Sequence, residues 1–363
     1  MQVNDRLLAP QIVHFESLQC VQQTRGPRTT AAILERMNLS RIWWPVALAS
    51  SLVISSAAAQ TSVPGKLGFE YQRLNNCGPM SAKMTLSLYG VDLPQADVAA
   101  ALKRTRADRN VTTPELAAYL GRFGLLTVRR WLITPALTRR LIAAGFPVIL
   151  HQTQKPGDDI GHFRVAHAFD SLTVLSGDSM FGPRTRHSER DFTRLSQPYN
   201  GEYLIAYRPQ QAKLLERVLG ADWGRTGNLN RLETVSAARI KAAPSDAFAW
   251  WGLGQARLFK GLSRTAAPAF KEAARLGLPA KHLWYQQDAL EAWNRVGWYG
   301  LSVDYATRAL RSYATSAELN THLARALEGL KRTAQAKTAW QAVLIENPRS
   351  PSARAALKPR PQI

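Results

Sequence analysis

Cysteine is scarce in this sequence, with two cysteines in 363 residues. A scaffold stapled by several disulfides is therefore excluded. Long apolar runs are also missing, which excludes a transporter with several membrane spans. Acidic residues are few, 26 against 47 Lys and Arg, so the net charge is +21. With 45% hydrophobic residues, the chain has enough apolar side chains and enough length for two folded domains.

The first recognisable segment begins at Met37. An apolar stretch covers residues 42–54, and Ala57 and Ala59 form a small-x-small pattern before Gln60. This stretch is too short for a bilayer span, which needs roughly 20 residues. The pattern predicts a signal peptide cleaved near Ala59–Gln60, and hence an exported chain, periplasmic or extracellular.

Two readings remain for the N-terminal residues. In the first, residues 37–59 are the signal peptide and residues 1–36 are a non-native extension from a misassigned start codon. In the second, residues 1–36 are genuine and 42–59 form an uncleaved anchor. Cleavage removes Cys20 and leaves Cys77 as the single thiol, which in an exported protein indicates a reactive or intermolecular cysteine.

The chain keeps most of its positive charge after the predicted cleavage of the signal peptide. The removed residues carry five Arg and three acidic residues, which leaves the mature chain near +19. Such a charge favours weak association with anionic cell-envelope surfaces. The basic residues form no run of five or more, so we expect no specific nucleic-acid binding. Metal-ligand spacings and phosphate-binding loops are lacking, so we expect neither a metal nor another cofactor.

Residues 64–208 combine helical and strand patterns. The helical signals come first and the strand signals follow, which predicts an α+β domain with an antiparallel sheet. Proline and threonine near position 113 indicate a helix start with Thr113 as the N-cap. The expected helices are 78–90, 94–104, 113–123 and 135–144, and the expected strands are 147–151, 163–170, 172–175 and 203–207.

Residues 213–350 change to Ala, Leu, Arg and Trp with almost no strand signal. The positions after Ala247 and Ala317 carry matching small and large apolar residues, at offsets typical of 34-residue tetratricopeptide repeats. Weaker units are expected near Lys213 and Lys281. The array is all-α, residues 351–363 form a flexible tail, and Trp250, Trp284 and Trp340 are expected in the helix-helix interior.

Four residues of the first domain suggest nucleophilic chemistry. Cys77 directly precedes a predicted helix, where free N–H groups and the helix dipole lower a thiol pKa. His162 and Asp178 fall on adjacent predicted strands, where they could lie side by side as base and orienter. Gln72 could donate to an oxyanion. His151 is a competing base, and His167 falls on the opposite strand face from His162.

At these residues the sequence resembles the bacteriocin-processing (double-glycine leader) cysteine peptidases of the papain-like group, family thirty-nine, especially their soluble branch. The resemblance covers roughly 65–208 and rests on 72–79, 161–170, 178–182 and the Ser188, Asp191 region. It implies a papain-like fold. It also implies a catalytic Cys77, a general base His162, an orienting Asp178 and an oxyanion-hole Gln72.

The sequence therefore predicts an exported cysteine peptidase that acts through a Cys77 thioester on peptide or protein substrates. The repeats are expected to bind a protein or peptide partner. Two alternatives remain open. In one, the peptidase fold is inactive and serves as a cell-envelope peptide-binding adaptor. In the other, the same residues act as an amide hydrolase or acyltransferase on cell-wall peptides.

Overall fold

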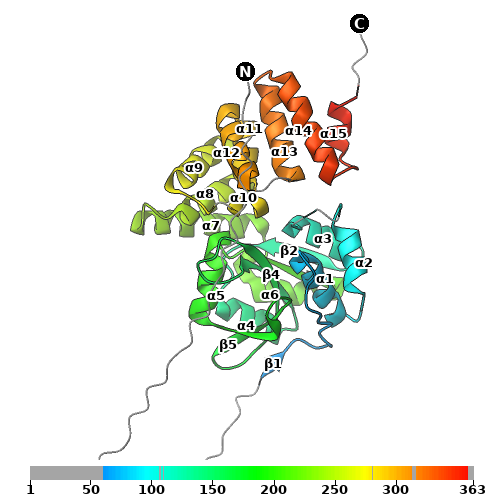
Figure 1. Ribbon diagram of the computed structural model, residues 1–363. Coiled ribbons are helices and arrows are strands. Elements are labelled where there is room, and N and C mark those ends of the chain that lie inside the picture. The colour runs from blue at the N-terminus through cyan, green and yellow to red at the C-terminus, as the bar shows by residue number, and fades with distance from the viewer. Residues whose placement is uncertain (1–59, 106–107, 109, 280, 313–315, 359–363) are drawn as a thin grey trace, which may run out of the picture. The chain divides into compact units, whose positions relative to one another are not determined.

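The computed structural model describes residues 60–363 except 106–107, 109, 280, 313–315 and 359–363. The predicted signal peptide and upstream extension lie outside these residues. An α+β domain comes first and helical repeats follow (Figure 1). This is the predicted fold class, a papain-like domain followed by a tetratricopeptide-like array. Within the described residues, every helix is too short or too polar to span a bilayer.

The α+β domain is built on one antiparallel sheet. Its strand order is β2-β7-β3-β4-β5-β6, and β1 pairs with β4. The central strands are almost wholly buried and form the core with the apolar faces of the surrounding helices. The strands are β1 (Thr61–Ser62), β2 (Leu126–Arg130), β3 (Val148–Thr153), β4 (Gly161–Phe169), β5 (Thr173–Asp178), β6 (Gly182–Ser188) and β7 (Tyr203–Tyr207).

Helices α1, α2 and α3 lie together beside the sheet (Figure 1). The domain's helices are α1 (Cys77–Leu88), α2 (Gln95–Leu102), α3 (Thr113–Gly121), α4 (Pro135–Ala143), α5 (Glu189–Ser196) and α6 (Ala212–Leu219), with short 3₁₀ turns η1 (Gln197–Tyr199), η2 (Pro209–Gln211) and η3 (Gly220–Asp222). One predicted cap is wrong. Thr112, not Thr113, caps α3, because the Thr112 hydroxyl accepts the Glu115 N–H while Glu115 accepts the Thr112 N–H.

In the described part of the array, consecutive helices pack against each other as the pairs α8–α9, α11–α12 and α13–α14. Predicted repeat positions are buried as expected: Phe270 and Trp340 are 0% and 4% exposed. A Cβ on Gly254 would lie 2.7 Å from the Phe270 ring, so glycine allows the close helix approach. The helices are α7 (Arg225–Ala242), α8 (Ala247–Phe259), α9 (Ser263–Leu276), α10 (His282–Tyr285), α11 (Asp288–Arg295), α12 (Tyr299–Ser312), α13 (Ala317–Gly329), α14 (Thr333–Glu346) and α15 (Pro351–Ala356).

Three details of the array differ from the prediction. The unit expected near Lys213 is not a repeat, because α6 packs into the α+β core. The unit near Lys281 begins with the four-residue α10 instead of a full helix, and its pair starts at Asp288. Part of the predicted flexible tail is helical, because the Ser350 hydroxyl caps α15 and Ala353 is buried.

The burial predicted for the tryptophans of the array is only partly correct. Trp340 is buried as predicted, but Trp250 and Trp284 are only half-buried. The fully buried tryptophans of the array are Trp251 and Trp293. Because one residue along a helix rotates a side chain by about 100°, a single-residue error moves a side chain from the core to the edge of the interface.

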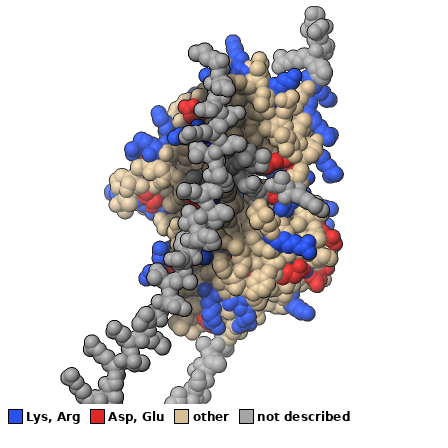
Figure 2. Space-filling view, viewed as in Figure 1, with Lys and Arg blue, Asp and Glu red and all other residues tan. Residues whose placement is uncertain are grey.

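Lys and Arg side chains are scattered over the visible face of both parts, with fewer acidic groups between them (Figure 2). This agrees with a basic sequence that lacks a concentrated basic run.

Candidate active site

Cys77 is the first residue of α1, and the loop before it is held firmly. Asn75 takes a left-handed φ of 59°, which asparagine tolerates better than most side chains. The buried Gln95 on α2 fixes both ends of the loop, since its Oε1 accepts from the Arg73 N–H at 2.7 Å and from Asn76 Nδ2 at 3.0 Å. The thiol therefore stands at a helix N-terminus on a rigid support.

Helix α1 approaches its neighbours closely at two points, one beside the thiol and one two turns further along the helix. A Cβ on Gly177 of β5 would lie 2.7 Å from the Met84 sulfur. A Cβ on Gly78 would lie 2.9 Å from the Val111 side chain. These two glycines allow α1 to seat against the sheet and against the 110–112 loop, which brings Cys77 to the edge of β4.

His162 lies between Cys77 and Asp178. The His162 Nε2 is 2.9 Å from Asp178 Oδ1, and the ring is also hydrogen-bonded to the Cys77 thiol. Since Nε2 faces the carboxylate, Nδ1 is the nitrogen left for the sulfur. His162 and Asp178 are 2% and 0% exposed. The structure thus brings three of the four predicted site residues into one line of contacts.

The electrostatics of this line favour a thiolate-imidazolium pair. Burial raises the pKa of Cys77, but the hydrogen bond and positive charge of His162, with the N–H groups of Phe163 and Gly78, outweigh it and lower the pKa. Burial likewise lowers the pKa of His162, but the bonds to Asp178 and Cys77 outweigh it and raise the pKa. The thiol is acidic and the imidazole is basic, as a nucleophile and its base require.

Asp178 is held ionised. Burial raises its pKa, but the hydrogen bond and charge of His162 and the charge of Arg164 together lower it. The N–H of Met180 also donates to Asp178 Oδ1 at 2.9 Å. A buried carboxylate with these partners can hold the imidazole in one orientation.

Arg164 is a site residue that the sequence reasoning did not identify. It is 1% exposed, and its Nε donates to Asp178 Oδ2, the oxygen that His162 does not contact. Its other nitrogens donate to the carbonyls of Thr153 and Gln154. The alternation of side chains along β4 could have revealed it. His162 and Arg164 are two residues apart, so their side chains lie on the same face of the strand. A charged side chain that is buried on that face needs an oppositely charged or hydrogen-bonding partner.

Gln72 lies at the turn that follows Asp178. Its backbone N–H donates to the Ser179 carbonyl at 2.9 Å, and its Oε1 accepts from the Ser179 hydroxyl at 2.7 Å. With the oxygen fixed, the Gln72 Nε2 is the side that can donate to a substrate oxyanion.

Lys103 is a second unpredicted neighbour of the thiol. Burial lowers its pKa, while the charges of Asp108 and Cys77 oppose that shift. Its ammonium lies 3.4 Å from the Asn76 side chain, one residue before Cys77. A cation at this position adds to the field that favours the thiolate.

The competing histidines are engaged elsewhere. His151 Nδ1 lies 2.8 Å from Glu202 Oε2, and its ring stacks on Tyr199 at 3.8 Å. His167 Nε2 lies 3.0 Å from the Pro183 carbonyl oxygen. The His151 alternative is therefore not supported. Within the described residues, no group of three or more His, Cys, Asp or Glu side chains could hold a metal ion.

Comparison with known protein families agrees with the resemblance that the sequence motifs indicate. Residues 58–204 match the model of the Peptidase_C39 like family, which confirms the predicted resemblance of this segment to that family. No curated protein matches the chain.

Solved structures of peptidase domains and of tetratricopeptide proteins each resemble a part of the chain. A double-glycine-motif protease from an AMS/PCAT transporter, solved with its leader peptide, is 20% identical, with 40% of this chain and 93% of that chain covered and a TM-score of 0.31. The peptidase domain of Streptococcus ComA, a bifunctional ABC transporter, is 17% identical, with 41% and 98% covered and a TM-score of 0.30. YrrB, a tetratricopeptide protein with an unusual peptide-binding site, is 19% identical, with 40% and 71% covered and a TM-score of 0.33.

Proposed function

We propose that this protein is a cysteine peptidase that hydrolyses peptide bonds through a thioester on Cys77. The observation that carries the proposal is the continuous contact from Cys77, half-buried at a helix N-terminus, through the buried His162 to the buried Asp178. A structural cysteine has no need of a basic imidazole held by an ionised carboxylate.

The roles follow from the geometry. The Cys77 thiolate attacks the substrate carbonyl carbon, and the N–H groups near the start of α1 and Gln72 Nε2 stabilise the oxyanion. The C–N bond then breaks, and His162 gives its proton to the leaving amine. A water molecule, deprotonated by His162, attacks the thioester carbonyl, releases the carboxylic acid and restores the thiol. No redox partner is needed.

The surface beside Gln72 supports a polypeptide substrate. Large apolar side chains are exposed on the two segments that meet at the Gln72–Ser179 contact, namely Tyr71 and Leu74 on one and Met180 and Phe181 on the other. Apolar groups left exposed next to a catalytic centre are suited to the side chains of a bound peptide. The repeat array would bind further parts of the substrate or a partner protein.

The direct test is cleavage of an unfolded protein and of a peptide library by the purified chain. The matched control is Cys77→Ala, which removes the nucleophile and leaves the fold. We expect cleavage by the wild type alone, with a covalent acyl-enzyme seen by mass spectrometry after an acid quench. Equal product from both proteins, or none from either, contradicts the proposal and leaves the non-catalytic adaptor.

We also propose that the protein works outside the cytoplasm. The proposal rests on the sequence pattern of residues 37–59. Expressed from Met37 in a bacterial host, the mature protein should begin at or near Gln60 and fractionate outside the cytoplasm. N-terminal sequencing checks this, and a mature chain that retains Trp43 and Trp44 contradicts it.

A further inference from the structure

A short segment of the repeat array touches both sides of the candidate active site. This segment, Lys281–Gln286, contains α10, and we call it the strap. Three contacts tie it to the α+β domain. Lys281 Nζ lies 2.8 Å from Asp159 Oδ1, the Asn110 amide donates to the Trp284 carbonyl, and Gln286 Nε2 donates to Glu202 at 3.0 Å.

The contacts fall on residues next to the catalytic pair. Asp159 belongs to the loop that leads through Gly161 into His162. Asn110 precedes Val111, whose side chain meets α1 at Gly78, directly after Cys77. The strap is therefore anchored on one segment that leads to His162 and on another that packs beside Cys77.

One strap side chain, Tyr285, packs against the residue that precedes His162. A Cβ on Gly161 would lie 2.7 Å from the ring of Tyr285 and 2.6 Å from the hydroxyl of Tyr199. Only a residue without a side chain fits against these two rings at the position before His162.

We infer that the strap sets the width of the substrate entrance, with Tyr285 as the specificity-determining residue. This inference rests on the proposed function, because it concerns access to the same thiol. The Tyr285 ring limits the size of the group that can pass Gly161 on its way to Cys77. The repeat array thus contributes directly to substrate selection, in addition to any partner that it binds elsewhere.

Alkylation with two probes tests the inference without depending on turnover. Iodoacetamide is small, and a fluorescein maleimide is bulky. In the full-length chain, Tyr285→Ala should raise the bulky-probe rate at Cys77 by about tenfold relative to the small-probe rate. Tyr285→Phe keeps the ring and should keep the wild-type ratio. Trp298→Ala, an exposed aromatic of the array outside the strap, is the matched control and should also leave the ratio unchanged.

A second variant tests the inference in case Tyr285→Ala does not fold. If the melting temperature of Tyr285→Ala falls sharply, Lys281→Ala, which frees the strap from Asp159 and removes no ring, should raise the same ratio. A ratio unchanged in the folded variants, with iodoacetamide still fast, overturns the inference and leaves the proposed function intact. A wild-type thiol that reacts with iodoacetamide like free cysteine overturns both.

Discussion

At the scale of single residues, the decisive pair is Cys77 and His162. The pKa of Cys77 is lowered and that of His162 is raised, and both shifts favour a thiolate beside an imidazolium. The thiol should therefore alkylate faster than a free cysteine at pH values below the usual thiol pKa of about 8.5.

His162→Ala tests this pairing. Removing the cationic partner should return the pKa of Cys77 toward or above its usual value, because burial then acts unopposed by the imidazolium. The alkylation rate at pH 6 should fall by more than about tenfold and recover as the pH rises past about 8.5. Iodoacetamide labelling with peptide mapping measures it. A rate profile identical to that of the wild type would contradict the pair.

Arg164 is predicted to be a positioning residue that acts through Asp178. With Arg164→Gln the carboxylate loses a charged partner, so the pKa of Asp178 should rise and the imidazole should be less firmly oriented. We expect turnover to fall by about ten- to a hundredfold and the acid limb of the pH-rate profile to move to higher pH.

The conservative variant separates this role from a structural one. Arg164→Lys keeps the charge and should keep the acid limb near its wild-type position, although it loses part of the donor geometry. A matched loss of activity in both variants, with no movement of the acid limb, would mean that Arg164 serves folding alone through its bonds to Thr153 and Gln154.

At the scale of elements, the sequence predicted the interior of the sheet and not its edges. Strands β3, β4, β5 and β7 were expected, because buried strands are continuous apolar runs. The two unpredicted longer strands, β2 and β6, are the two edges of the sheet. Edge strands carry charged and polar residues, which discourage pairing with further strands; Arg184 and Arg186 are such residues in β6. The alternation of apolar and polar residues that predicts a strand is therefore weak in an edge strand.

The same reasoning explains what could be predicted of the site. Cys77, His162 and Asp178 sit at element ends that turn signals mark, so their proximity could be inferred from an antiparallel order of strands. Arg164 could not be identified without knowing its partner, because a basic residue in a strand is usually solvent-exposed. The strap could not be predicted, because α10 has only four residues and is too short to show the hydrophobic periodicity of a helix.

The helix pairs offer a packing test. Phe270 on α9 is fully buried and lies against Gly254 of α8. Phe270→Ala should cost about 3–5 kcal/mol of unfolding free energy by emptying this contact. Leu262→Ala, at a side chain that is 50% exposed, is the control and should cost far less. Urea unfolding followed by circular dichroism measures both, and equal costs would contradict the pairing of α8 with α9.

At the scale of the whole molecule, the α+β domain and the array share several contacts. Trp131 stacks on Phe259 of α8 with ring centroids 5.1 Å apart, and it forms a small buried cluster with Leu229 and Leu232 of α7. Glu202, buried beside His151, accepts from Gln286 of the strap. The α+β domain and the array therefore pack together through both an apolar cluster and a buried polar contact.

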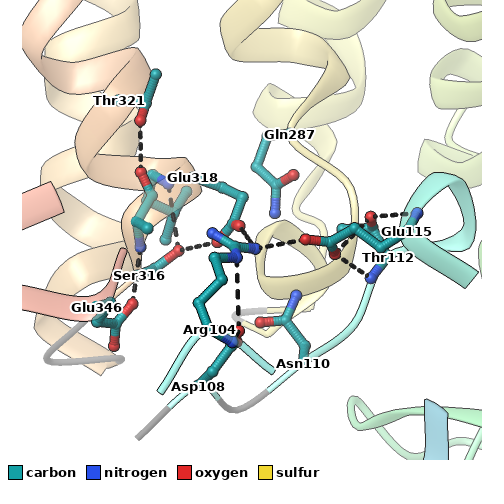
Figure 3. Close-up of polar contacts among 12 residues, drawn as sticks. Arg104, Asp108, Asn110, Thr112, Glu115, Gln287, Ser316, Glu318, Thr321 and Glu346 are labelled. Atoms are coloured by element: carbon teal, nitrogen blue, oxygen red, sulfur yellow. Dashed lines mark hydrogen bonds and ion pairs between the residues drawn. The ribbon is translucent and has the colours of Figure 1, made fainter. Parts of the chain in front are cut away.

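The clearest polar link is Arg104. Its guanidinium contacts Glu115 and Asp108 of its own domain and Glu318 on α13 of the array (Figure 3). Burial raises the pKa of Asp108 to about 6, although Arg104 opposes this shift. Three carboxylates therefore depend on one cation, and removing it leaves them facing one another.

Arg104→Ala should consequently destabilise the junction by about 1.5–3 kcal/mol, the range for hydrogen bonds to charged groups. The loss should be largest above pH 6, where Asp108 is ionised, and smaller below it, because a protonated Asp108 no longer repels Glu115 and Glu318. Hydrogen exchange at α13 and urea unfolding at pH 5 and pH 8 measure it. Arg275→Ala, which breaks an exposed pair with Glu272 on α9, is the control and should change little. If both variants lose equal stability at both pH values, Arg104 is an ordinary surface residue, and the array is held to the α+β domain by its apolar contacts alone.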